Sequence, residues 1–280
     1  MSSTATKNAE RDRRGSAGHI PRKRFGQHFL GDPFWVRRIV EAIAPRSGER
    51  LVEIGPGLGA LTEPLLASVE RLHVVEIDRD IVAHLENTYP RERLIVHAGD
   101  ALAFDFRGIG TDLRLVGNLP YNISTPLLFH VAAQAGHVRD AHFMLQKEVV
   151  DRMVAAPGGS DYGRLSVMLQ YRFAMEKLFD VPPGAFRPPP KVDSSVVRMI
   201  PHGRLPHPAL DERLLGELVT RAFTQRRKTL RNALSTYLTA AELEALDIDS
   251  GARPETLGVA AWVRAADRVA ARGATLPSSG

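Results

Sequence analysis

The sequence predicts an α/β fold that consists of a Rossmann-like parallel sheet, an antiparallel strand pair at the end of that sheet, and a small all-α C-terminal domain. Three observations support this prediction. Short apolar runs alternate with helical patterns in the first part of the chain, at 51–54, 72–77, 94–96, 113–116 and 142–145. The alternation stops between 170 and 201, and from Asp211 onward the apolar periodicity is helical.

The elements of the first half are bounded by capping residues and turns. Asp32 followed by Pro33 favours the start of a helix, and the apolar residues that come next have helical spacing. The strand 51–54 runs into a glycine-rich turn at 55–59, and Asp78 is placed to cap the helix after the second strand. Strands separated by helices in this way form parallel pairs with right-handed crossovers.

The second half contains the signals for the domain boundary. Ser124 begins a helix that stops near Gly136, and two extended runs flank the proline-rich loop 182–190, which suggests the antiparallel pair. Prolines and a glycine gather at 202–210, where we place a boundary. We therefore divide the chain into a disordered basic arm, a Rossmann-like domain, a helical domain and a flexible tail, at 1–20, 21–203, 204–272 and 273–280.

The composition is that of an ordinary globular protein. Hydrophobic residues make up 44% and charged residues 25% of 280, which excludes collagen, disorder throughout and a multi-span membrane protein. Cysteine is absent, which excludes disulfides, thiolate zinc, iron–sulfur clusters and cysteine nucleophiles, and the 10 histidines show no metal-binding spacing. The uncharged stretch 115–138 contains polar residues such as Asn118 and Gln134, and no secretory signal is visible, so we expect a cytoplasmic protein without a metal.

The net charge of +5 is distributed unevenly. Residues 1–24 carry a charge of +5 and residues 185–231 carry +6, whereas residues 25–184 carry −4. A basic arm and a basic belt on an acidic body indicate a polyanionic partner that is met at two places.

The turn Gly55-Pro56-Gly57-Leu58-Gly59 lets the backbone approach a ligand closely. Its spacing is Gly-x-Gly-x-Gly, and it has no lysine for a triphosphate. Glu76, at the end of the second strand, is placed to bond a pair of ribose hydroxyls, and Asp100, at the end of the third, to accept from an adenine amino group. These features indicate an adenosine-containing cofactor. The plainer alternative is a glycine turn of any α/β fold, with the acids as helix caps.

Asn118-Leu119-Pro120-Tyr121 closes the fourth strand and suits group transfer to a planar amine. An adenine amino nitrogen is a poor nucleophile because its lone pair is delocalised into the ring. The Asn118 side-chain oxygen and a carbonyl of the turn can accept its two hydrogens and favour a tetrahedral nitrogen. Tyr121 can stack on the base. The alternative is a proline turn with a buried tyrosine.

Two weaker signals suggest contacts with a substrate. Phe186 follows a proline-rich loop and is placed to form the second wall of an adenine sandwich with Tyr121, unless it is a core residue. A run of basic residues at helical spacing is expected to contact phosphates, unless it is only a solvated helix face; its members are Arg221, Arg226, Arg227, Lys228 and Arg231.

Five motifs in order resemble the ribosomal RNA adenine N6,N6-dimethyltransferase family. They are RFGQHFL at 24–30, EIGPGLG at 53–59, NLPY at 118–121, FRPPPKVDS at 186–194 and QRRK at 225–228. The resemblance runs from about Pro21 to about Val269, and the last two motifs favour the small-subunit group of the family.

The resemblance implies S-adenosylmethionine as methyl donor and, as substrate, two adjacent adenosines near the 3′ end of 16S rRNA in the small ribosomal subunit. We expect a monomer. The implied cofactor contacts are His28, Leu30, Gly55, Gly57, Glu76, Asp100 and Asn118, although many family members have asparagine at position 28. Catalysis is expected at 118–121 with Phe186, and RNA binding in the helical domain. The alternatives are a large-subunit rRNA methyltransferase, an organellar transcription factor of the same fold, and an assembly factor that acts mainly by binding.

Overall fold

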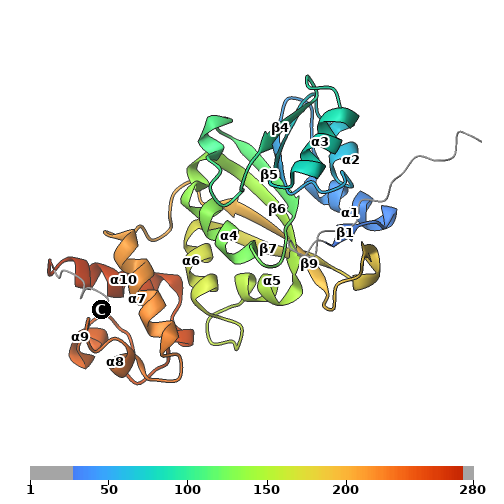
Figure 1. The fold of residues 1–280 in the computed structure, drawn as a ribbon. Coiled ribbons are helices and arrows are strands. Elements are labelled where there is room, and N and C mark those ends of the chain that lie inside the picture. Colours follow the sequence, from blue (N-terminus) through green and yellow to red (C-terminus); the bar gives the residue numbers. More distant parts are fainter. Residues whose placement is uncertain (1–27, 274–280) are drawn as a thin grey trace, which may run out of the picture.

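The computed structural model describes residues 28–273 and is built on a seven-stranded sheet in the order β4-β3-β2-β5-β6-β9-β7 (Figure 1). The strands from β4 to β6 in this order are parallel, and β9 pairs antiparallel with β6 and β7. The predicted parallel sheet with an antiparallel pair at its end is confirmed. Its strands are β2 (Arg50–Ile54), β3 (Leu72–Glu76), β4 (Leu94–Ala98), β5 (Leu113–Asn118), β6 (Val138–Gln146), β7 (Phe173–Val181) and β9 (Ser194–Pro201).

Helices cover both faces of this sheet. One core cluster takes side chains from α1 (Pro33–Ile43), α2 (Thr62–Leu66) and α3 (Arg79–Thr88). The opposite cluster takes them from α4 (Ser124–Ala133), α5 (Lys147–Val154) and α6 (Arg164–Arg172). Neighbouring residues of a strand serve different clusters, as Leu51 and Val52 of β2 do, because side chains alternate between the faces of a sheet.

Short polar side chains fix the starts of two helices, as the sequence predicted. The Asp32 carboxylate accepts a hydrogen bond from the Phe34 amide at 2.9 Å, and Pro33 is the first residue of α1. The Asp78 carboxylate accepts from the Asp80 amide at 2.9 Å in the same way. Each cap satisfies an amide that has no partner inside its helix and sets the angle at which the chain leaves the preceding segment.

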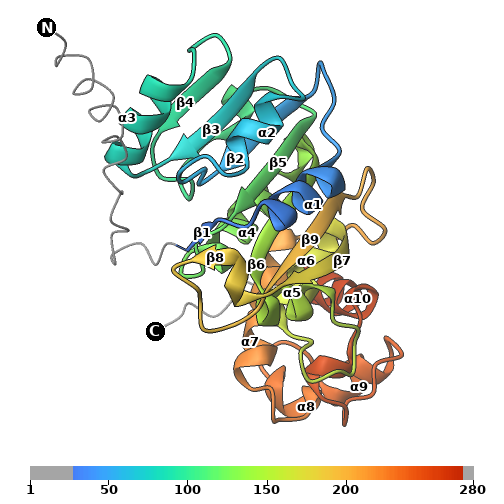
Figure 2. The ribbon, with the colours of Figure 1, turned by 90° about the vertical axis from the view of Figure 1, so that its right-hand side faces the viewer.

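A second, two-stranded sheet joins segments that are far apart in the sequence. β1 (Phe29–Leu30) pairs antiparallel with β8 (Phe186–Arg187), so the N-terminal motif lies beside the proline-rich loop (Figure 2). This pairing was not predicted. Its consequence is that residue 28 is held next to the carboxyl end of the main sheet.

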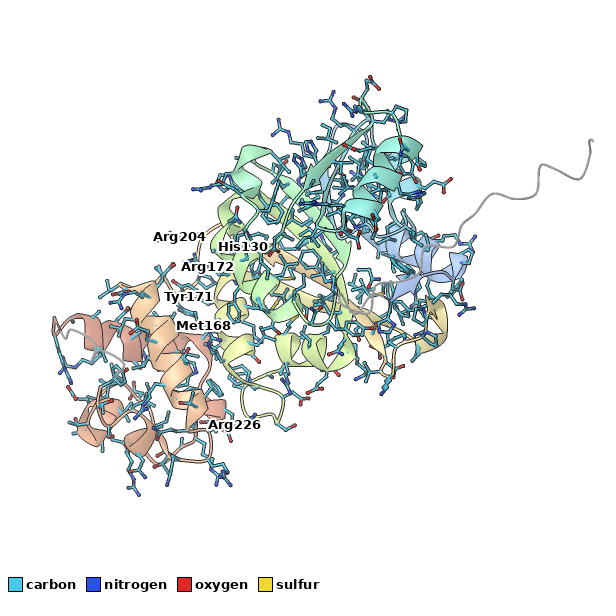
Figure 3. All side chains as sticks on the ribbon, viewed as in Figure 1. His130, Met168, Tyr171, Arg172, Arg204 and Arg226 are labelled. Carbon is cyan, nitrogen blue, oxygen red and sulfur yellow. The ribbon has the colours of Figure 1, made fainter. Side chains whose placement is uncertain are left out.

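The C-terminal helices have a core of their own, which confirms the predicted all-α part. They are α7 (Glu212–Thr224), α8 (Leu230–Ala233), α9 (Ala240–Glu244) and α10 (Val259–Ala270). This core also contains Tyr162, Val167 and Tyr171, which precede the boundary placed at 203/204. Figure 3 shows Met168, Tyr171 and Arg172 where α6 faces α7. The packing therefore crosses the boundary in sequence. Short 3-10 turns complete the fold at Phe106–Gly108, Ala135–His137, Pro183–Ala185 and Pro254–Thr256.

The basic run 221–231 does not form one helix face, so this expectation is wrong. α7 ends at Thr224, and the chain turns there, with the Gln225 amide donating to the Ala222 carbonyl at 3.0 Å. The Lys228 amide closes a further turn on the Gln225 carbonyl at 2.8 Å, and α8 begins only at Leu230. Arg226, Arg227 and Lys228 therefore lie in the loop between the two helices.

Several expectations concern parts of the chain that the structure does not describe. The arm 1–20, residues 24–27 of the first motif and the tail beyond residue 273 lie outside the described residues. Within residues 28–273, no helix combines the length and the apolarity that a membrane span requires.

Candidate functional site

A cavity of about 650 Å³ lies where β2, β3, β4 and β5 end, at the carboxyl edge of the parallel strands. All residues predicted to bind a cofactor line it, although they come from five separate segments: His28, Leu30, Gly55, Gly57, Glu76, Asp100 and Asn118. Leu119, Pro120 and Tyr121 line it as well. The edge at which ligands bind in open α/β sheets therefore holds the predicted cofactor residues and the tetrapeptide 118–121.

The floor of the cavity is the glycine turn after β2. Gly55 and Gly57 have φ angles of +66° and +55°, which residues with a Cβ rarely adopt. A Cβ added to Gly57 would lie 3.0 Å from two ring atoms of Phe29, so this turn has no room for a side chain on that side. The exposed apolar side chains Leu58 and Ile77 line the same cavity and offer it two hydrophobic surfaces.

Glu76, the last residue of β3, is held by the backbone and is 5% exposed. Its Oε1 accepts hydrogen bonds from the Ile77 amide at 2.8 Å and the Asp78 amide at 2.9 Å. Burial raises the pKa of this carboxyl, and the amide donors oppose the rise. The carboxylate is thus fixed in orientation at the cavity wall, as a ligand of a ribose must be.

Asp100 lies two residues beyond the end of β4 and is exposed. Its Oδ1 accepts from the Leu102 amide at 2.9 Å, so it caps the turn that follows, whereas the plainer alternative expected it to cap a helix. It lines the cavity at the same time. The two interpretations are therefore compatible, because the cap uses one carboxylate oxygen.

The tetrapeptide 118–121 forms the wall opposite the acids. The Asn118 amide nitrogen donates to the His28 carbonyl oxygen at 3.1 Å, so the side-chain oxygen is the atom left for a substrate amine. Leu119 is buried, and its backbone amide donates to the Met144 carbonyl at 3.1 Å. Gly117 is the residue in the sequence that permits this arrangement, because a Cβ added at this position would lie 2.5 Å from the Ile54 carbonyl oxygen.

His28 connects this wall to the proline-rich loop. Its Nδ1 lies 2.8 Å from the Pro188 carbonyl oxygen, and its ring centroid lies 5.7 Å from that of Tyr121. The two rings are inclined by 31°. The β1–β8 pairing explains why residue 28 reaches the cavity although it precedes β2 by more than twenty residues in the chain.

Phe186 does not reach the cavity, so its expected place in an adenine sandwich is wrong for this structure. It is fully buried in the core cluster of α1 to α3, and it pairs with Leu30 across the β1–β8 ribbon. Side chains alternate along a strand, so the next residue, Arg187, faces the other way, and Arg187 lines the cavity. The core alternative describes Phe186 correctly.

Glu53 lines the same cavity, although it was not among the predicted site residues. It is 2% exposed, and Thr62 Oγ1 donates to its Oε2 at 2.6 Å. Burial raises the pKa of the Glu53 carboxyl to about 7, and the nearby Glu76 charge adds to the rise. The sequence feature that could have identified Glu53 is an acidic residue inside an apolar strand that leads directly into the glycine turn.

Replacing Glu53 with glutamine should stabilise the protein by roughly 3 kcal/mol at pH 8 and by much less at pH 5. The raised pKa means that the folded state holds a proton that the unfolded state releases between the ordinary carboxyl pKa and about 7, so wild-type stability falls as pH rises through this window. Denaturant unfolding of both proteins at several pH values measures this. A stability difference that is independent of pH would contradict it. Glutamine is the suitable substitution because it retains a side-chain oxygen that can accept the hydrogen bond from Thr62.

The five basic residues of the run 221–231 fall into two groups. Arg226 is half-buried, and its guanidinium donates to the Ser160 carbonyl at 2.6 Å and lies 3.8 Å from Glu255. It therefore connects the 225–228 loop to the loop before α6 (Figure 3). The other four are exposed and make no ion pair with any acid in the described part of the chain: Arg221, Arg227, Lys228 and Arg231.

A family model and a similar known protein indicate the same family. The family model described as ribosomal RNA adenine dimethylase matches residues 18–271. The chain is 63% identical, over 91% of its length and 98% of the relative's, to ribosomal RNA small subunit methyltransferase A of Laribacter hongkongensis. A solved dimethyladenosine transferase from Plasmodium falciparum matches with a TM-score of 0.74 and 26% identity over 88% of this chain and 98% of that one. The solved 23S rRNA methyltransferase ErmE matches with a TM-score of 0.67 and 24% identity over 86% of this chain and 99% of that one, which shows a likeness of fold alone.

Proposed function

Because the chain belongs to the ribosomal RNA adenine dimethylase family, we propose that it transfers methyl groups from S-adenosylmethionine to two adjacent adenosines near the 3′ end of 16S rRNA. The products are N6,N6-dimethyladenosines. The observation that carries the choice of substrate is the 63% identity to a relative named for the small subunit, over nearly the whole of both chains. The cavity supports the chemistry, because cofactor-type and amine-binding residues meet in it.

The described residues fit S-adenosylmethionine by their chemistry. Glu76 would accept from the ribose hydroxyls, and Asp100 from the adenine amino group, for which its exposed side chain has a second oxygen. Gly55 and Gly57 permit close approach of the backbone, and Ile77 presents an apolar surface to the base. When bound, the cofactor supplies a methyl group on a positively charged sulfur, which is a strong electrophile.

The chain's own contribution to the reaction is to prepare the target amine. The Asn118 side-chain oxygen and a carbonyl of the 119–120 turn accept the two amine hydrogens, so the nitrogen becomes more tetrahedral and its lone pair is available. Tyr121 lies against the base and fixes its plane. No strong general base is needed, because the methylated ammonium is acidic and loses its proton readily. Most of the rate enhancement comes from positioning.

We assign RNA binding mainly to residues 204–272, beside a methyltransferase domain at 21–203. The four exposed cations of the run 221–231 lie on one stretch of chain around the α7–α8 loop, where phosphates can reach them. Arg226 is excluded from this group because its guanidinium is already bonded within the protein. RNA affinity should therefore depend more on Arg227 and Lys228 than on Arg226.

The function is tested by incubating the protein with methyl-labelled S-adenosylmethionine and unmethylated small subunits, and by mapping the label. We expect label on two adjacent adenosines near the 3′ end of 16S rRNA, as N6,N6-dimethyladenosine. Label in 23S rRNA would favour the large-subunit alternative. Tight binding to the subunit without any label would identify an assembly factor that has lost the chemistry.

Arg226 and the pair Arg227 and Lys228 should respond oppositely to alanine substitution. The double variant R227A/K228A removes up to two phosphate contacts. A plot of the logarithm of the RNA association constant against the logarithm of the salt concentration should therefore become less steep, by about 1.4 to 1.8 in slope, with the stability of the protein unchanged. R226A should leave that slope unchanged and lower the free energy of unfolding by about 1 kcal/mol, because its partially exposed bonds to the 159–160 carbonyls are lost. Salt-dependent binding and denaturant unfolding measure both. A reduced slope in R226A would return Arg226 to the RNA-binding group.

A further inference from the structure

The phenol of Tyr121 is bonded to a rigid part of the sheet. Its oxygen lies 2.8 Å from Ser194 Oγ, and Ser194 is fully buried. Ser194 is the first residue of β9 and has strand neighbours on both sides, in register with Gln146 of β6 and Val181 of β7. An anchor of this kind moves little, because its backbone is fixed by two ladders of hydrogen bonds.

Tyr121 itself lies in a less constrained place. It belongs to the turn between β5 and α4, and its side chain is half-buried at the cavity wall. Its backbone carbonyl accepts from Ser124 Oγ at 3.0 Å, which fixes the near end of the residue. The bond to Ser194 holds the far end, at the para position of the ring. Together the two contacts determine how the ring is tilted in the cavity.

We propose that Ser194 is a positioning residue for methyl transfer, which holds the Tyr121 ring in the plane that receives the target adenine. This inference rests on the proposed function, because it takes Tyr121 as the surface on which the base lies. A ring that rocks about its Cα–Cβ bond would let the amine leave the line of attack. Small misplacements of this kind reduce the rate more than they reduce binding.

The next residue provides a matched control. Ser195 is fully buried as well, and its Oγ donates to Asp180 Oδ1 at 2.5 Å. Successive side chains point to opposite faces of the sheet, so Ser195 points away from Tyr121. S194A and S195A therefore remove the same group from the same strand, and only the first touches the cavity wall.

The kinetic test compares S194A, S195A, Y121F and the double variant S194A/Y121F in the methylation assay. We expect S194A to lower kcat by about tenfold, the effect of losing one neutral hydrogen bond, with the Kd for S-adenosylmethionine unchanged. S195A should keep its kcat. In the Y121F background S194A should have no further effect, because the bond is already absent. A tenfold loss that persists in the Y121F background, or an equal loss in S195A, would overturn the inference.

A second measurement is independent of activity. In protein labelled with ¹³C at the ring carbon that bears the hydroxyl, the chain's 5 tyrosines give resonances, and the one missing in Y121F belongs to Tyr121. We expect this resonance to shift in S194A and to stay in place in S195A. An unshifted resonance in S194A overturns the inference. If wild-type protein methylates no RNA, the proposed function fails, whereas the spectra still decide whether Ser194 holds Tyr121.

Discussion

Replacing Asn118 with alanine should lower the rate of methyl transfer by about 10² to 10³, while affinity for the small subunit barely changes. In the mechanism that we propose, the side-chain oxygen of Asn118 is the acceptor that polarises the target amine, and its loss resembles the loss of one hydrogen bond made in the transition state. Some loss of cofactor affinity is also expected, since Asn118 lines the cavity in which we propose that the cofactor binds. A methylation assay beside a subunit-binding assay on the same variant measures both effects.

Asn118 also has a structural contact that must be separated from catalysis. Its amide nitrogen donates to the His28 carbonyl, so alanine removes one bond between β5 and the segment before β1. Asn87, which is exposed on α3 and does not line the cavity, provides a control, because N87A removes a side-chain amide outside the amine-binding position. Near-wild-type turnover of N118A would remove Asn118 from the mechanism. Parallel loss of binding and turnover would mean that the two functions are not divided as we propose.

Replacing Glu76 with alanine should weaken S-adenosylmethionine binding by at least about tenfold without unfolding the protein, because a hydrogen bond to a charged group contributes roughly 1.5–3 kcal/mol. Burial raises the pKa of Glu76, so wild-type affinity should also fall as pH is lowered through that raised pKa. In E76A this pH dependence should disappear. Calorimetry at several pH values measures affinity and its pH dependence together.

The control for Glu76 comes from the helix that follows it. Glu86 is exposed on α3, and E86A removes a carboxylate from the same part of the molecule at a distance from the cavity wall. It should bind the cofactor as wild type does. Unchanged affinity in E76A would rule out the ribose contact and leave the carboxylate with its bonds to the backbone amides of residues 77 and 78.

The sequence predicted the sheet and most of the cavity because these depend on local signals. Apolar runs mark the strands, and Glu76 and Asn118 end theirs, so their meeting at one edge follows from parallel order alone. The β1–β8 ribbon could not be predicted, since strands of two residues have no periodicity. α5 and α6 were missed as well, although α5 has an amphipathic pattern, because α5 follows β6 directly without a capping side chain and α6 has only 9 residues.

Side-chain direction was the least predictable property. Phe186 and Arg187 are adjacent, and only the pairing of β8 with β1 decides which of them turns to the core. Arg226 and Arg227 are adjacent too, and a contact with a loop more than sixty residues earlier decides which of them is used inside the protein. The sequence shows no sign of either choice, because each depends on a partner that is brought close only by the complete fold.

The shared core of α6 and the C-terminal helices limits how this chain can be recombined. Tyr162 is fully buried among C-terminal side chains, and its phenol donates to the Leu257 carbonyl at 2.9 Å. Tyr171 bonds Glu212, the first residue of α7. A chimera that exchanged helical parts between relatives at residue 204 would separate these partners. The exchangeable module is therefore the C-terminal part together with the segment from Tyr162 to Arg172, two stretches that would have to be inherited as a pair.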